Sequence, residues 1–176
     1  EGLFIYLKSS NLIDTSKIDA YKIVSNIYDL VNKDNIINST ILGIKDTYVL
    51  DDYIYVSYTA EINDGCYNTS ILRSKLSLEK LNFKIFFKPD ECVKYNNNHF
   101  GGRITYFKDN KLLLTVGEVG KGTGSQDLKN YFGSIVSINI DKFNDSNEQH
   151  IKDYEIISFG HRNPQGLHYN KNKNLI

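Results

Sequence analysis

Short apolar segments separated by tight turns recur along the chain, and this spacing restricts it to structures built mainly from strands. The 176 residues include 21 Ile, 8 Val and 13 Tyr but only 2 Ala; β-branched and aromatic residues favour strands, whereas Ala favours helices. Many short strands joined by tight turns are typical of a β-sandwich, a β-barrel or a β-propeller. We predict an all-β protein with strands at residues 3–7, 41–50, 53–59, 69–76, 83–88, 103–107, 111–116, 135–140, 155–159 and 166–169.

Residues 11–38 fit two patterns. A helical stripe is formed by Ile18, Tyr21, Val24, Tyr28 and Val31. The same region also fits two short strands, at residues 21–24 and 27–31. The strand-rich composition of the chain favours strand or irregular structure here.

Charge and hydropathy exclude several classes of protein. Lys and Arg together number 21, as do Asp and Glu, so the chain lacks the basic surplus that nucleic acids and anionic membranes attract. No apolar run approaches the roughly 20 residues that cross a bilayer as a helix. Because 40% of the residues are hydrophobic, disorder is also excluded. We predict a soluble, globular protein.

The first candidate site has the sequence NNNHFGGR at residues 96–103. His99 ends a polar loop just before a predicted strand, and the two glycines allow the backbone to approach a bound group closely. A histidine in that position can accept a proton near neutral pH. The alternative is an ordinary histidine in a surface loop.

The glycine-rich loop GEVGKGTG at residues 117–124 is a weaker candidate. Its Gly-Lys pair is followed by Gly122 where a phosphate-binding loop needs Ser or Thr. We therefore interpret it as a flexible connection.

The third candidate is the sequence GHRNPQG at residues 160–166, which follows an apolar strand. A simple turn needs Gly, Pro and Asn but has no use for His, Arg and Asn together. Arg162 offers a fixed fork of donors that suits carboxylates or quinone oxygens. The functional interpretation is preferred here.

The two cysteines, Cys66 and Cys92, flank the predicted strand pair 69–76 and 83–88. If these strands pair about a turn near residues 78–80, the two cysteines face one another. Directly opposed residues can have Cα atoms about 4.5–5.5 Å apart, which is within disulfide range. We predict a Cys66–Cys92 disulfide, which favours an oxidising compartment. Two free thiols are the alternative, because a bulge near Gly65 or Pro89 would shift the register.

The order of the motifs resembles the soluble quinoprotein glucose dehydrogenases, and among them the aldose sugar dehydrogenase branch, also called glucose/sorbosone dehydrogenases. The resemblance extends from about residue 41 to residue 169, and GHRNPQG is its most specific part. The segments that carry it are ILGI at 41–44, YIYVSYT at 53–59, HFGGR at 99–103, LLLTVGE at 112–118, SQDL at 125–128, FGSIVSIN at 132–139 and GHRNPQGL at 160–167.

The resemblance implies a six-bladed β-propeller with pyrroloquinoline quinone (PQQ) and calcium on its axis. About four strands make a blade, so residues 1–176 would form a single partial propeller domain, roughly the first three blades of an N-terminal half. We expect sequence beyond residue 176 to complete the propeller and to supply the calcium ligands.

The resemblance also implies roles for individual residues. His99 matches the general base that removes the proton of the sugar's C1 hydroxyl, while a hydride passes from C1 to C5 of the quinone. Arg162 and Asn163 match residues that bind the quinone's carbonyl oxygens, and Glu118 and Gln126 match sugar contacts. The implied function is PQQ- and calcium-dependent oxidation of an aldose to its lactone, with an external electron acceptor, in a periplasmic or secreted protein.

One departure and two alternatives accompany this interpretation. The sequence NST at residues 38–40 replaces a Glu/Gln-Gly pair of the family, which puts one polar contact to cofactor or sugar in doubt. A non-catalytic propeller of the hedgehog-interacting type, which binds a protein or carbohydrate ligand, shares part of the pattern, but His161 and Gln165 favour the dehydrogenase. A calcium-dependent lactonase-type propeller needs clustered acidic ligands that this segment does not supply.

Overall fold

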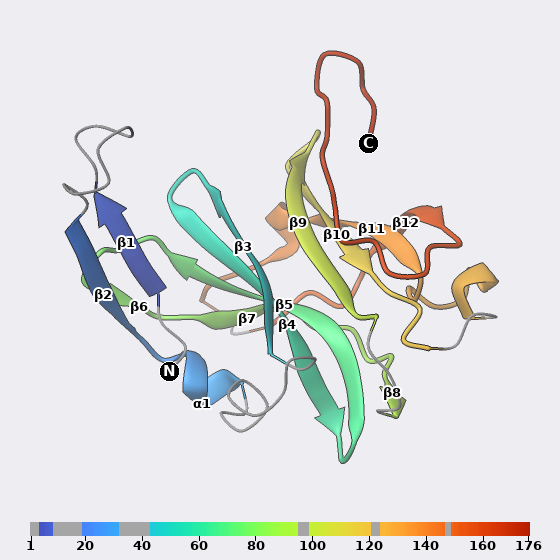
Figure 1. Ribbon diagram of the computed structural model, residues 1–176, viewed down its shortest axis with the longest axis horizontal. Coiled ribbons are helices and arrows are strands. Elements are labelled where there is room, and N and C mark those ends of the chain that lie inside the picture. The colour runs from blue at the N-terminus through green and yellow to red at the C-terminus, as the bar shows by residue number, and fades with distance from the viewer. Residues whose placement is uncertain (1–3, 9–18, 32–42, 95–98, 121–123, 147–148) are drawn as a thin grey trace.

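Three sheets lie side by side in the computed structural model, which describes residues 4–8, 19–31, 43–94, 99–120, 124–146 and 149–176 (Figure 1). Strands dominate the described residues, and the helical elements are single turns. The all-β class predicted from composition is therefore confirmed. No helix in the described part of the chain is long and apolar enough to cross a membrane.

The first sheet has the order β1-β2-β6. β1 (Phe4–Lys8) pairs antiparallel with β2 (Asp19–Ser25), and β6 (Lys80–Leu81) pairs with β2 in parallel. The strand expected at 21–24 is thus present. A strand at 27–31 is wrong, because α1 (Ile27–Leu30) makes one helical turn there and buries Ile27. The rest of the ambiguous stretch lies outside the described residues.

The second sheet is centred on a long hairpin, with the order β3-β4-β5-β7. Its strands are β3 (Ile44–Leu50), β4 (Tyr53–Asn63), β5 (Cys66–Lys75) and β7 (Lys84–Phe87), and β8 (Val93–Lys94) also pairs with β5. The predicted hairpin about residues 51–52 is confirmed. The tight turn expected near 78–80 is wrong, because β6 leaves the hairpin there to join the first sheet.

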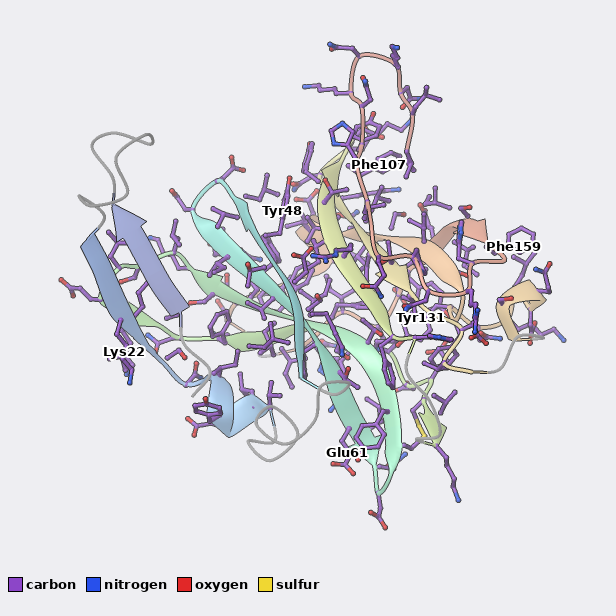
Figure 2. The ribbon with its side chains drawn as sticks, viewed as in Figure 1. Lys22, Tyr48, Glu61, Phe107, Tyr131 and Phe159 are labelled. Carbon is purple, nitrogen blue, oxygen red and sulfur yellow. A yellow bond between two sulfur atoms is a disulfide. The ribbon has the colours of Figure 1, made fainter. Side chains whose placement is uncertain are left out.

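The third sheet has the order β12-β11-β10-β9, with every neighbouring pair antiparallel. Its strands are β9 (Gly101–Phe107), β10 (Lys111–Val116), β11 (Ser134–Asn139) and β12 (Glu155–Phe159). All four were expected to within two residues. Phe159, at the end of β12, lies near the outer edge of the molecule (Figure 2).

The strand predicted at residues 166–169 is wrong. These residues form no strand, and their apolar side chains instead pack on the third sheet. Leu167 and Tyr169 cover a small cluster of Phe107, Leu113 and Ile135, and the Tyr169 ring meets the Phe107 ring at 4.8 Å. The apolar pattern thus identified burial correctly, but no described strand lies alongside to pair with this backbone.

The main core lies between the second and third sheets, whose strands β3 and β9 are neighbours. Tyr131 is fully buried in it, and Figure 2 shows its position. Its hydroxyl accepts a hydrogen bond from the Thr69 amide at 3.0 Å and donates one to the Thr69 carbonyl at 3.2 Å. This phenol therefore ties the loop after β10 to strand β5.

Cys66 and Cys92 form a disulfide, with Cα atoms 5.4 Å apart. The register on which the pairing was predicted is not uniform. The observed pair Ile71↔Phe87 agrees with the predicted register. The partner of Leu72, Ile85, is shifted by one residue from that register, and the partner of Tyr67, Val93, is shifted by two residues in the other direction. The cysteines still meet because the chain between β7 and β8 turns back towards β5. There the side-chain amide of Asn68 donates hydrogen bonds to the Pro89 and Glu91 carbonyls, at 2.9 Å each.

Candidate functional site

Antiparallel pairing gathers the sequence motifs at one end of the third sheet, which we call the site end. β9 begins there, and β10 and β12 finish there. His99 therefore lies just before β9, Glu118 just after β10, and Arg162 and Asn163 just after β12.

His99 and Glu118 form a close pair. The His99 Nδ1 lies 2.7 Å from a carboxylate oxygen of Glu118. The Glu118 side chain is 6% exposed and that of His99 is 24% exposed, so the carboxylate is nearly enclosed while the imidazole retains access to solvent. An ionised carboxylate accepts a hydrogen bond from Nδ1–H, which leaves Nε2 as the basic nitrogen of the neutral ring.

The backbone at His99 is in the left-handed region, with φ of 67°. Non-glycine residues seldom adopt this conformation, and at functional sites it is held by surrounding contacts. One such contact joins the Val119 amide to the His99 carbonyl at 3.3 Å. The chain around His99 is thus held by both the backbone and the side chain of the segment that follows β10.

The geometry gives Glu118 a contact that the sequence did not predict. Its side chain is nearly buried because it turns inward to meet His99, and the sugar contact at the loop rim that the resemblance implies stays a prediction. Its other neighbours form a pocket of about 320 Å³ lined by Glu91, Cys92, Val93, Val119, Gly124, Asn130 and Phe132. Glu118 is thus placed to orient His99.

The loop at 160–166 is attached to the same segments. The Arg162 carbonyl accepts a hydrogen bond from the Glu118 amide at 2.8 Å. The Asn163 side-chain oxygen accepts one from the Gly101 amide at 3.2 Å and one from the Gln165 side chain at 2.8 Å. Backbone and side-chain contacts therefore bring His99, Glu118, Arg162 and Asn163 into one cluster.

Arg162 keeps its charged group available. Its side chain is exposed, and none of the described residues pairs with it. The amide nitrogen of Asn163 likewise has no partner within the described ranges, because the contacts of this side chain use its oxygen. The loop thus presents N–H donors that no side chain or backbone group among the described residues accepts.

Two further residues of the sequence motifs lie at the site end but outside this cluster. Gln126 is in a short 3-10 turn, η2 (Gly124–Gln126), and its amide lies against Gly160, where a Cβ would come within 2.9 Å of it. No described contact joins Gln126 to His99. The His161 Nε2 lies 2.8 Å from the Ser158 hydroxyl, which ties the start of the loop to β12.

Thr115 is a residue that the sequence analysis missed. It is fully buried, and its hydroxyl lies within hydrogen-bond distance of the Gly102 and Arg103 amides and of the Pro164 carbonyl. A threonine in a strand is ordinary, so the sequence carries no signal for this position. The calcium ligands, expected beyond residue 176, stay a prediction; the described residues hold no group of three or more His, Cys, Asp or Glu side chains that fits a metal.

Comparison with known proteins agrees with the motifs. The family model described as glucose/sorbosone dehydrogenase matches residues 30–176. The chain belongs to this family. Aldose sugar dehydrogenase YliI of Escherichia coli (strain K12) is 29% identical over 146 residues, which cover 76% of this chain and 39% of that protein. The chain therefore spans less than half the length of this relative.

Solved structures support the propeller interpretation. A glucose dehydrogenase structure superposes with a TM-score of 0.62 at 22% identity, covering 76% of this chain and 45% of that one. The apo-form of the soluble aldose sugar dehydrogenase of Escherichia coli gives a TM-score of 0.56 at 28% identity, over 70% of this chain and 37% of that one. The sheets of this chain are thus part of a β-propeller, and the number of blades in the whole protein stays a prediction.

Proposed function

We propose that the whole protein oxidises an aldose sugar at C1 to the lactone, with PQQ as cofactor and calcium as its metal. Family membership supports a sugar dehydrogenase. The observation that carries the finer proposal is the His99–Glu118 pair, which lies beside an arginine and an asparagine whose side-chain N–H groups have no acceptor among the described residues.

His99 removes the proton of the C1 hydroxyl through Nε2. Glu118 fixes the ring orientation by accepting the Nδ1–H hydrogen bond, and its carboxylate stabilises the imidazolium that forms. Because the Glu118 side chain is 6% exposed, water competes little for this hydrogen bond. The partly exposed imidazole remains accessible to a sugar from solution.

The loop residues fit a quinone. Carbonyl oxygens need N–H donors, and the guanidinium of Arg162 and the amide of Asn163 are both uncommitted among the described residues. These two residues would hold the quinone oxygens and stabilise negative charge that develops on them. When bound, PQQ supplies the two-electron oxidant that accepts the hydride of C1, and calcium supplies a Lewis acid.

The disulfide bears on the cellular location. Disulfides persist in oxidising compartments and are rare in reducing ones, so the Cys66–Cys92 bond supports a periplasmic or secreted protein. An external electron acceptor would then reoxidise the cofactor between turnovers.

Reconstitution of the whole protein with PQQ and calcium, followed by dye reduction with a panel of aldoses, tests the proposal. We expect PQQ-dependent reduction with at least one sugar and none with PQQ omitted. Absence of quinone-dependent activity with every sugar would favour the non-catalytic binding propeller instead.

Replacement of His99 by Ala tests the general base. Turnover of the reconstituted protein should fall by about two to four orders of magnitude, while PQQ affinity stays nearly unchanged. His168→Ala is a matched control, because His168 is exposed and lies outside the cluster. Undiminished turnover in His99→Ala would remove this residue from the mechanism.

Arg162→Ala tests the quinone-binding loop. Both PQQ affinity and turnover should fall, because the exposed guanidinium is assigned to the cofactor and to the charge that develops on it. Titration of the apoprotein with PQQ measures the affinity directly. An unchanged affinity contradicts the assigned role.

A further inference from the structure

The strand that leads from His99 is interrupted at the site end. β9 and β10 pair regularly up to Leu114↔Ile104, and the next pair is Val116↔Gly101. Two residues of β9, Gly102 and Arg103, thus lie opposite the single residue Thr115, which is the arrangement of a β-bulge. A bulge leaves backbone groups without ladder partners, and buried N–H groups need another acceptor.

The Thr115 hydroxyl supplies that acceptor. It accepts hydrogen bonds from the Gly102 amide at 3.1 Å and the Arg103 amide at 2.9 Å. It donates one to the Pro164 carbonyl at 3.0 Å. A hydroxyl has one hydrogen to donate and two lone pairs to accept, so all of its capacity is used.

These three bonds join two parts of the site that are distant in sequence. Gly102 and Arg103 follow His99 in the strand, and Pro164 directly follows Arg162 and Asn163 in the loop. Thr115 is fully buried, so water cannot replace its hydroxyl without opening the sheet.

Other buried hydroxyls hold the start of β9 from the second sheet only. Thr69 donates to the Phe100 carbonyl at 2.7 Å, and the Ser57 hydroxyl donates to the Gly102 carbonyl. Within the described part of the chain, neither hydroxyl forms a hydrogen bond to the loop at 160–166. Thr115 therefore differs from them in reaching both halves of the site.

We propose that Thr115 is a positioning residue that fixes His99 relative to Arg162 and Asn163. The inference rests on the proposed function for the roles of those three residues. The link itself, which consists of the three hydrogen bonds of the Thr115 hydroxyl, is a property of the fold and does not depend on that function. Serine at position 115 keeps the hydroxyl, whereas valine keeps the shape and removes it.

The test compares Thr115→Val and Thr115→Ser in the whole protein reconstituted with PQQ and calcium. The valine variant should lose about 10- to 100-fold in turnover, the usual effect of removing a group that orients a functional residue, and should bind PQQ more weakly. The serine variant should stay within a few-fold of the wild type. Ser137→Ala, which removes a buried hydroxyl of β11 that bonds Glu155, controls for a general loss of stability.

Hydrogen exchange of the Gly102 and Arg103 amides gives a readout that needs no activity. Exchange should be at least about tenfold faster in Thr115→Val than in Thr115→Ser or Ser137→Ala, because two amides lose their acceptor. If the wild type oxidises no sugar, the proposed function fails. The exchange rates alone then show whether the Thr115 hydroxyl holds the Gly102 and Arg103 amides. Wild-type exchange in the valine variant would overturn the inference, as would equal turnover in the valine and serine variants.

Discussion

The hairpins β4–β5 and β9–β10 are both rich in buried apolar residues, yet the first is regular up to the residues next to its turn, whereas the second is broken at the site end. β4 and β5 pair without interruption from Tyr53↔Lys75 to Glu61↔Tyr67, and residues 54–60 of β4 are all buried. β9 and β10 pair regularly only away from the site end, and their register shifts at Thr115.

The difference shows where side chains replace the backbone ladder. Along β4–β5, backbone groups of the two strands satisfy one another. At the site end of β9, side-chain hydrogen bonds hold the backbone instead: Ser57 and Thr69 donate to its carbonyls, and Thr115 and Asn163 accept from its amides. Such contacts allow the positive φ values of His99, Gly101 and Gly102, which a regular strand does not accommodate. The regular hairpin therefore acts as the scaffold and the broken one carries the site.

The largest effect on stability should come from the disulfide beside the regular hairpin. Replacing both cysteines with serine removes a cross-link between residues 26 apart, which should lower the free energy of unfolding by about 3 kcal/mol in the chain-entropy model. Denaturant titration with and without reductant measures it, and the double variant should not respond to reductant. Two reactive thiols per chain in unreduced, denatured protein would contradict the disulfide.

A smaller loss of stability, with a local effect on the site, is expected for Gly117→Ala at the end of the broken hairpin. A Cβ on Gly117 would lie 1.7 Å from the His99 carbonyl oxygen, so the backbone of His99 must move. The free energy of unfolding should fall by about 2 kcal/mol, as for other overpacked sites. The NMR signals of the His99 ring should shift as well.

Gly166→Ala is the matched control for stability, because nothing lies within 4 Å of its Cβ position. Its free energy of unfolding should stay within about 0.5 kcal/mol of the wild type. Equal losses in the two variants would show that glycine entropy, and not contact with His99, sets the cost at Gly117.

The smallest effect, which is confined to alkaline pH, comes from two buried phenols in and beside the regular hairpin. Burial raises the pKa of Tyr58 on β4 and of Tyr131, which bonds Thr69 on β5. In the unfolded chain these tyrosines lose their protons near pH 10, whereas the native state retains them. Stability is therefore fully present below about pH 10 and should fall above it, by about 1.4 kcal/mol per pH unit for each such group.

Denaturant titrations at about pH 9 and pH 11 measure this loss, and tyrosinate absorbance should rise together with unfolding. Tyr131→Phe removes one titrating group, so its stability should fall less steeply with pH. An unchanged slope in this variant would contradict the role of Tyr131 in alkaline unfolding.

Local patterns predicted most of the strands. The third sheet follows from short apolar segments and tight turns, as at residues 108–110, because both signals depend on neighbours in sequence. The errors occurred where the partner lies far away in the chain. Lys80–Leu81 pairs with β2 instead of forming a hairpin turn, and Leu167 and Tyr169 pack on the third sheet without a strand partner.

The candidate site shows the same division. Motif order identified His99, Arg162 and Asn163 as one group, and the structure places them in contact through Glu118 and Gly101. The contact of Glu118 with His99 was not predicted, because the direction of its side chain depends on the loop conformation after β10. Thr115 lies within the LLLTVGE segment, but nothing in that segment singled it out.

The sequence by itself determined the strand-rich class, the turns and the motifs, because residue type and spacing along the chain encode local conformation and burial. Only the tertiary structure decided which buried polar groups meet. Three features depend on segments that are separate in the chain: the register shift opposite Thr115, the burial of the Glu118 carboxylate and the hydrogen bond between Asn163 and Gly101. Those contacts depend on how sheets and loops pack, since buried N–H and C=O groups take whichever partners that packing brings within reach.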